Sequence, residues 1–199
     1  MERTMRLHLT GTRPVLFHNG RLANPLDPHT RAIARIAKKR NKTDSDYAEL
    51  AQIEARGGMY EAPGDMLGLP IGNVLTCLRD AGKTFKLGKA IEQAILLPDA
   101  NPVVPVLLGG QPVACDTYLG GDEAANRLLY VSVVVNRRRT MRARALAPAG
   151  WEATCEFTVL TDVIQPEHLK PVIERAGRLG GLCDWRPRYG TFSADVVWV

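Results

Sequence analysis

The start of the chain alternates between apolar and polar residues. Met5, Leu7 and Leu9 fall on one side of an extended segment, with polar residues between them. Such alternation predicts a β-strand with one buried face. Residues 191–199 are predicted to form a final strand at the other end of the sequence.

Two helices are predicted after the first strand. Asp27 followed by Pro28 is typical of a helix start, because aspartate caps free amide groups and proline fits the first turn. This helix is expected to run to about Arg40. A second helix begins near Asp44 and ends at the glycine pair 57–58. Together they predict a helical hairpin with a strongly basic first arm.

A third helix is predicted from about Asn73 to Phe85, because apolar residues recur there at helical spacing. The side chains expected to face the core are Val74, Leu78, Ala81 and Phe85. Residues 91–121 instead carry frequent glycine and proline, which argues for extended segments and against a helix.

Residues 128–135 are rich in β-branched side chains and predict a strand, and the alternation continues over 137–147. In that continuation Arg138, Arg142 and Arg144 fall on the same side. We therefore expect these arginines to face a common ligand. After a turn at 148–150, residues 151–164 are expected to return as the partner strand.

A last helix is predicted over 166–176, before the final strand. The order of elements is close to β-α-β-β-α-β, so we expect one α+β domain over residues 1–199 with a ferredoxin-like or RRM-like core and an antiparallel sheet. The helical hairpin at about 24–60 and a β-rich segment at about 91–125 are expected to be insertions into that core.

Composition narrows the protein classes further. Of the 199 residues, 45% are hydrophobic and 24% charged, which is typical of a globular domain. No apolar run is long enough to span a membrane, and the first residues do not form a secretory signal, so no membrane association is expected. The four scattered cysteines fit neither a zinc site nor a disulfide framework, which favours a reducing cytoplasm and no metal or other cofactor.

Basic residues are concentrated in two segments that contain no acid. Six lie between Asp27 and Asp44, and six more between Glu123 and Glu152. Together these two segments carry a charge of +12. Because the net charge of the whole chain is +5, the remaining residues carry a net charge of −7. Segregation of this kind favours a polyanionic partner over a merely solvated face. In the first segment we expect contacts from Lys38, Lys39 and Arg40.

Catalytic motifs are weak. Gly82-Lys83-Thr84 resembles the end of a phosphate-binding loop, but Cys77 stands where that motif requires its first glycine. Asp27 is expected to be a helix cap rather than a metal ligand. His18 would act as a general base only with a partner that the sequence does not reveal. We therefore expect a binding protein rather than an enzyme.

The segment from Gly177 to Phe192 concentrates four glycines with aromatic and basic residues. Glycines at 177, 180, 181 and 190 allow close approach of the backbone to another group. Arg186 and Arg188 would face the same way if the segment is extended, with Trp185 on the opposite side in the core. The pattern favours a binding loop over a plain turn.

These features together resemble the RAMP superfamily, RRM-like proteins that include the guide-RNA-binding backbone subunits of CRISPR complexes. Residues 67–81, LGLPIGNVLTCLRDA, are similar to the family's motif at the start of its helix, and residues 177–192 to its glycine-rich loop. An early strand followed by a basic insertion is the third match. The chain is also similar to small proteins encoded by bacteriophages and prophages, so the cytoplasm in question would be that of a bacterial host.

The resemblance implies binding of single-stranded nucleic acid, largely independent of sequence, by protomers that stack along the strand. The helix motif would place Asn73, Arg79 and Lys83 near the bound backbone. The glycine-rich loop would place there Gly180, Gly181, Trp185, Arg186 and Arg188. Aromatic residues make up only 6% of the chain, so phosphate contacts are expected to outweigh stacking. RNA and DNA both remain open.

Two alternatives remain. One is a ribonuclease of the same superfamily, which includes members that cut RNA with a loop aspartate after the first strand. Here Asp27 with a divalent metal, or His18 as base, would have that role. The other is a phage-encoded module that docks its basic face on a host protein complex.

Three expectations test the binding hypothesis. Five to seven phosphate contacts would give a log–log salt slope of about −4. Replacing Arg142 and Arg144 with glutamate should abolish binding with little loss of stability. Gly181→Val should weaken binding more than folding.

Overall fold

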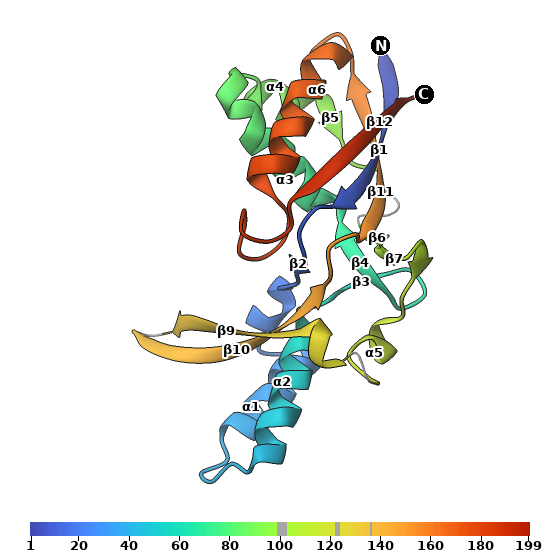
Figure 1. The fold of residues 1–199 in the computed structure, drawn as a ribbon. Helices are drawn as coiled ribbons and strands as arrows, with labels where there is room; N and C mark the ends of the chain where they lie inside the picture. Colours follow the sequence, from blue (N-terminus) through green and yellow to red (C-terminus); the bar gives the residue numbers. More distant parts are fainter. Residues whose placement is uncertain (99–102, 122–123, 136) are drawn as a thin grey trace.

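The structure is a computed structural model that describes residues 1–98, 103–121, 124–135 and 137–199. The strands of its largest sheet are β1 (Glu2–Gly11), β5 (Ile95–Leu96), β7 (Leu107–Leu108), β8 (Gln111–Pro112), β11 (Glu152–Leu160) and β12 (Phe192–Trp198). β1 lies between β12 and β11, and β5 and β7 pair with the other side of β11 (Figure 1). All of these pairings are antiparallel. Both predicted terminal strands are confirmed.

Helices cover one face of this sheet (Figure 1). On β1, Met5, Leu7 and Leu9 are at most 1% exposed, which confirms the buried face predicted from their alternation. The helical elements on this side are α3 (Ile71–Gly82), a 3-10 turn η2 (Lys83–Phe85), α4 (Gly88–Ala94) and α6 (Pro166–Arg175). Phe85 was expected in the core but is 41% exposed, because the α-helix ends at Gly82 and the chain turns away.

The long arginine-containing strand forms a hairpin of its own. β9 (Leu128–Val135) pairs with β10 (Arg138–Ala147), and the short β2 (Val15–Leu16) pairs with the end of β10. Arg137 lies between β9 and β10 in a left-handed backbone conformation, with a φ of 63°. The expected return of 151–164 along this strand is therefore wrong, because β11 pairs with β1 instead.

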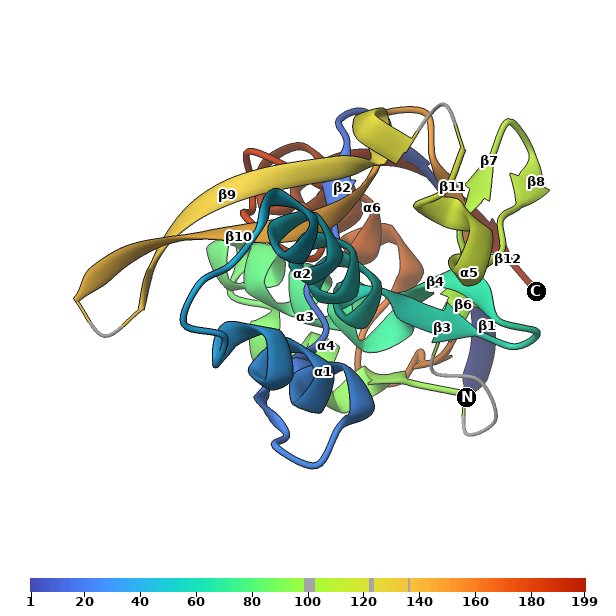
Figure 2. The ribbon, with the colours of Figure 1, turned by 90° about the horizontal axis from the view of Figure 1, so that it is seen from below.

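The helical hairpin predicted near the N-terminus is present. α1 (Pro28–Ala37) and α2 (Asp44–Gly58) follow a 3-10 turn, η1 (Gly20–Ala23). Asp27 caps α1 as expected, and Thr43 forms a reciprocal capping box with Asp46 at the start of α2. α2 packs beneath β10, and the β9–β10 hairpin extends beyond the body of the protein in both views (Figures 1 and 2).

A third, small sheet connects the two halves. It contains β3 (Tyr60–Ala62), β4 (Met66–Pro70) and β6 (Val103–Pro105), and the neighbouring helical turns are α5 (Cys115–Tyr118) and η3 (Ala124–Arg127). The expectation that residues 91–121 contain no helix is wrong at both ends, where α4 reaches Ala94 and α5 begins at Cys115. Short strands occupy part of the segment between, as its glycine and proline content predicts.

The α+β class and the antiparallel sheets expected from the sequence are confirmed. Burial of three of the four free cysteines, Cys77, Cys115 and Cys155, agrees with their apolar sequence context. Within the described ranges, no helix combines the length and apolar character needed to cross a bilayer.

Candidate nucleic-acid interface

Three adjoining cavities run along one side of the protein, and together we call them the groove. The lower cavity, of about 510 Å³, lies between the η1–α1 region and the β9–β10 hairpin. The middle cavity, of about 160 Å³, shares His18 with it. The upper cavity, of about 370 Å³, lies between α3 and the glycine loop (residues 177–190) and shares Arg186 with the middle one.

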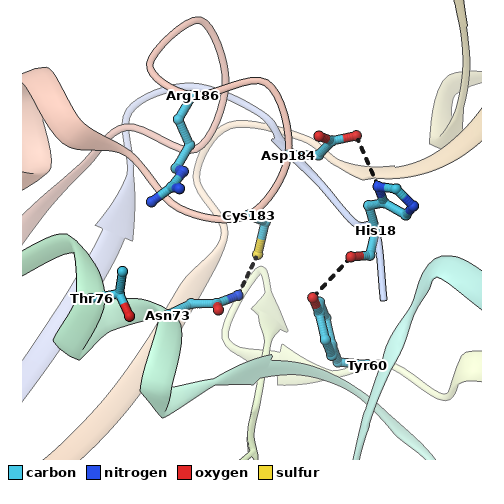
Figure 3. Close-up of a pocket in the computed structure, with 7 residues that line it drawn as sticks. All are labelled: His18, Tyr60, Asn73, Thr76, Cys183, Asp184 and Arg186. Atoms are coloured by element: carbon cyan, nitrogen blue, oxygen red, sulfur yellow. Dashed lines mark hydrogen bonds and ion pairs between the residues drawn. The ribbon is translucent and has the colours of Figure 1, made fainter. Parts of the chain in front are cut away.

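The middle cavity is lined almost entirely by polar side chains from distant parts of the sequence (Figure 3). Asn73 and Thr76 come from the first turns of α3, and Asn73 Nδ2 donates to Cys183 Sγ at 3.7 Å. Tyr60 Oη donates to the carbonyl of His18 at 3.0 Å. These contacts leave a polar recess between α3 and the glycine loop.

His18 stands at the wall between the lower and middle cavities, beside an ion pair. Arg144 Nε lies 3.0 Å from Asp184 Oδ2, and Arg144 Nη2 lies 3.4 Å from His18 Nδ1. Burial, followed by the charge of Arg144, lowers the pKa of His18, and Asp184 only partly offsets this. His18 Nδ1 also lies 3.7 Å from Asp184 Oδ2 (Figure 3). The lowered pKa favours a neutral imidazole, and Arg144 and Asp184 are the neighbours that the sequence did not reveal.

Two of the three arginines expected to bind on β10 are paired with acids, although both line the lower cavity. Arg142 pairs with Glu54 of α2, whose other oxygen accepts from the Ala143 amide at 3.0 Å. Arg144 is 7% exposed and pairs with Asp184. Acids distant in sequence therefore neutralise both side chains. The side chain of Arg138 lies outside what the structure describes, whereas those of Arg137 and Arg139 near the tip are exposed.

The glycine loop carries two exposed arginines, of which Arg186 lines the groove. Arg186 and Arg188 are both exposed, and the described residues place no acid within ion-pair distance of either. In Figure 3 the Arg186 side chain points from the loop toward α3.

Burial raises the pKa of the Cys77 thiol to about 11 and that of Cys183 to about 12, and the nearby Arg186 charge only partly offsets this.

Trp185 was expected in the core, but it is 38% exposed and its ring lies 6.2 Å from that of Tyr189. The loop is a turn rather than an extended segment, since the Tyr189 amide donates to the Trp185 carbonyl at 3.1 Å. Trp185 itself has a φ of 54°. Alternation of side chains, the basis of the expectation, therefore does not apply here.

The glycines of this loop accommodate the chain itself. A Cβ on Gly180 would lie 2.7 Å from Cys77 Sγ, and one on Gly181 would lie 2.8 Å from the Tyr189 carbonyl oxygen. Gly181 has a φ of 74° and a ψ of 169°, a conformation that is almost restricted to glycine. The close approach predicted from these glycines exists, but its partners are α3 and the loop, not a ligand.

The two basic residues predicted on α3 also have acidic partners. Arg79 lies 3.3 Å from Glu92 and 3.5 Å from Asp80, and Lys83 lies 2.7 Å from Asp80. Asp80 lines the upper cavity together with Arg175 and Arg186, whereas Arg79 and Lys83 do not line it. Of the predicted residues on α3, Asn73 alone lines a cavity.

The basic cluster at the end of α1 lies apart from the cavities. Lys39 Nζ is 2.5 Å from Asp46 Oδ1, and this contact is the largest of the influences that lower the pKa of Asp46 to about 2. Lys38 and Arg40 are exposed, with no acid within ion-pair distance among the described residues. None of the three lines the groove.

Several groove residues carry no signal in the sequence. Tyr60, Thr76 and Arg175 were not among the predicted contacts, yet they line the middle or upper cavity. Each belongs to a different element, and each was assigned to local structure rather than to a site. Only the tertiary packing of β3, α3 and α6 brings them to the same groove.

The side chains described in this region offer little support for a metal-dependent reaction. The Asp27 carboxylate accepts from the amides of His29 and Thr30, at 2.8 and 3.4 Å, and so acts as the α1 cap. Over residues 1–98, 103–121, 124–135 and 137–199, no three His, Cys, Asp or Glu side chains group closely enough to hold an ion.

No family model and no curated protein matches this chain.

Proposed function

We propose that the protein binds a single strand of nucleic acid, RNA or DNA, along the groove without reading its sequence. The observation that carries this proposal is the position of Arg186, an exposed guanidinium on the wall shared by the middle and upper cavities. Because no acid of the described residues lies within ion-pair distance of it, its donors are available to phosphate oxygens. Arg188, two residues further along, supplies a second such group.

The chemistry of the groove fits a phosphate backbone better than a small apolar ligand. Beside Arg186, the middle cavity is lined by the side chains of His18 and Asn73 and by Thr76, whose hydroxyl can donate. At the loop, the exposed Trp185 and the partly exposed Tyr189 provide aromatic rings on which bases can stack. Because contacts to phosphate and stacking do not distinguish bases, they support binding that is independent of sequence.

The strand order of the largest sheet also supports a more specific fold. We propose a ferredoxin-like core in which β1, β5, β11 and β12 are the four strands of a β-α-β-β-α-β unit. The antiparallel order β12–β1–β11–β5 supports this, with α3 and α4 in the first crossover and α6 in the second. Membership of the RAMP superfamily, with protomers stacked along one strand in a bacterial cytoplasm, is proposed on the resemblance of residues 67–81 and 177–192.

The nuclease alternative has less support than binding. The Nδ1 atom of His18 is already in contact with Arg144 Nη2 and Asp184 Oδ2, at 3.4 and 3.7 Å. Asp27 is already engaged as a helix cap. Incubation of labelled RNA with and without Mg²⁺ tests this alternative directly, since we expect no cleavage under either condition.

Fluorescence anisotropy with labelled 30-nucleotide poly(U) and poly(dT) tests the proposal. We expect both to bind, and Arg186→Ala to weaken binding by about 5- to 30-fold, the loss typical of a charge-assisted hydrogen bond. Lys89→Ala on α4 is the matched control, because it removes one exposed charge away from the groove. Equal losses for both variants, or no binding by the wild type in 50 mM salt, would refute the proposal.

A further inference from the structure

One edge of the largest sheet, at β12, has no partner strand among the residues that the structure describes. It pairs with β1 on one side only and ends the strand order. Hydrogen bonds between Thr4 and Val199, and between Thr12 and Thr191, fix which backbone groups face β1. By alternation the N–H and C=O groups of Ala194, Val196 and Trp198 point to the open side.

A cavity of about 560 Å³ lies along this open side, between β12 and α6. Ala194, Val196 and Trp198 line it and are only partly buried, although their neighbours Leu9, Leu7 and Met5 on the same face of β1 are fully buried. α6 therefore covers β1 but leaves an apolar strip on β12 open. Free backbone groups beside an apolar strip are what an added β-strand requires.

The edge also lacks the features that usually block strand addition. Phe192–Trp198 contains no proline or lysine, and its register with β1 runs without a bulge. The same surface is unsuited to a nucleic acid, because Glu167, Glu174 and Asp195 line the cavity with a single lysine, Lys170. The partner expected here is therefore a protein strand.

From these observations we infer that β12 pairs antiparallel with β12 of a second copy, about a two-fold axis at Val196. In this register Trp198 lies opposite the partner's Ala194, so that the largest side chain of the strip meets the smallest. Asp195 lies opposite the partner's Val197, so the carboxylates do not face each other. An axis at Asp195 would instead bring two like charges together at the closest strand spacing.

This pairing goes beyond the proposed function and does not depend on it. A two-fold contact closes on itself after two copies, whereas protomers stacked along a strand require a head-to-tail contact. Val196 donates its N–H to the open side, so the pairing adds hydrogen bonds without removing any between β12 and β1. The two sheets would become one continuous antiparallel sheet.

The oligomeric state of the full chain tests this inference. Light scattering after nuclease treatment and in 0.5 M salt, where nucleic-acid bridging is suppressed, should give twice the chain mass of 21.9 kDa. Val196→Pro removes only an outward N–H and should raise the dimer dissociation constant at least tenfold with the circular dichroism spectrum unchanged. A wild type that stays monomeric at 100 µM would overturn the pairing.

Cysteine cross-linking tests the register. At the proposed axis the two copies of residue 196 have Cα atoms about 5.5 Å apart, within disulfide range. Val196→Cys should therefore cross-link under mild oxidation, whereas the matched Ala194→Cys variant should not exceed the wild-type background. Cross-linking through Ala194→Cys that equals or exceeds that of Val196→Cys would overturn the register, and neither variant cross-linking would overturn the interface.

Discussion

The arginines of β10 and those of the glycine loop have surroundings opposite to those that their sequence contexts predict. Arg142 and Arg144 lie two residues apart in an acid-free segment, yet Glu54 and Asp184 neutralise them. Arg186 follows Asp184 by two residues, yet it is exposed and has no acidic partner among the described residues. An acid-free run in the sequence is therefore no guide to an acid-free surface.

The difference follows from where each segment lies in the fold. β10 packs on α2, where Arg142 meets Glu54, and Arg144 meets Asp184 of the glycine loop; burial favours pairing over solvation at both places. The arginines of the turn at 185–189 are exposed, with no acid of the described residues within ion-pair distance. We therefore propose that Arg142 and Arg144 contribute to stability, and Arg186 and Arg188 to binding.

The largest expected effect is on folding. Arg144→Ala leaves Asp184 partly buried without its cation, and the unfolding free energy should fall by about 3–5 kcal/mol. Urea denaturation measures this change. A loss below about 1 kcal/mol would indicate that Arg144 is a solvated surface arginine. The sequence-based expectation that replacing both Arg142 and Arg144 hardly changes stability would then hold.

Gly181→Val should be the next most damaging change. Its backbone conformation costs a residue other than glycine about 1–3 kcal/mol, and the added Cβ would also meet the Tyr189 carbonyl. We expect a lower melting temperature, contrary to the sequence-based expectation that binding would suffer more than folding. Gly150→Val, at a surface turn with open space around its Cα, is a comparison for left-handed strain alone.

The salt dependence of binding should be shallower than the charge count suggests. Without Arg142 and Arg144, three to five phosphate contacts remain of the five to seven expected, which gives a log–log slope of about −3. Titration of the binding constant between 50 and 300 mM salt measures the slope. A value near zero would contradict binding through phosphates, and one steeper than −4 would restore the hairpin arginines to the interface.

The smallest effect concerns the cap of α2. Hydrogen bonding to Lys39 and to Thr43 holds the pKa of Asp46 at about 2, below its ordinary value of 3.8. A lowered pKa in the folded state contributes stability above about pH 4, and that contribution is lost as the pH falls through 3.8 toward 2. Asp46→Asn should lower stability at pH 7 and flatten its decline over this range. Melting curves between pH 2 and 7 test this, with Asp44→Asn as the matched control.

Periodicity and capping residues predicted much of the secondary structure. The alternation at Met5, Leu7 and Leu9 and the Asp27–Pro28 start both gave correct elements, because each depends on neighbours within one turn or strand. Strand pairing was harder to predict from the sequence. β11 joins β1 across about 150 residues, and nothing local in 151–164 distinguishes that partner from β10.

The site was predicted in part for the same reason. Arg186, Arg188 and Asn73 could be singled out by residue type and by their loop or helix context. The pairing of Arg142 with Glu54 and the contact between Gly180 and Cys77 could not, because they depend on packing between distant elements. Glycine content indicated a close approach but not which group approaches.

The most direct test compares two double variants in one binding measurement. Arg186→Ala/Arg188→Ala removes the loop arginines, whereas Arg142→Met/Glu54→Gln removes a hairpin arginine with its partner charge and keeps an acceptor for the Ala143 amide. The dissociation constant for labelled poly(U), measured by anisotropy, should rise at least tenfold for the first and stay within twofold for the second. The reverse order would contradict the assignment of binding to the glycine loop.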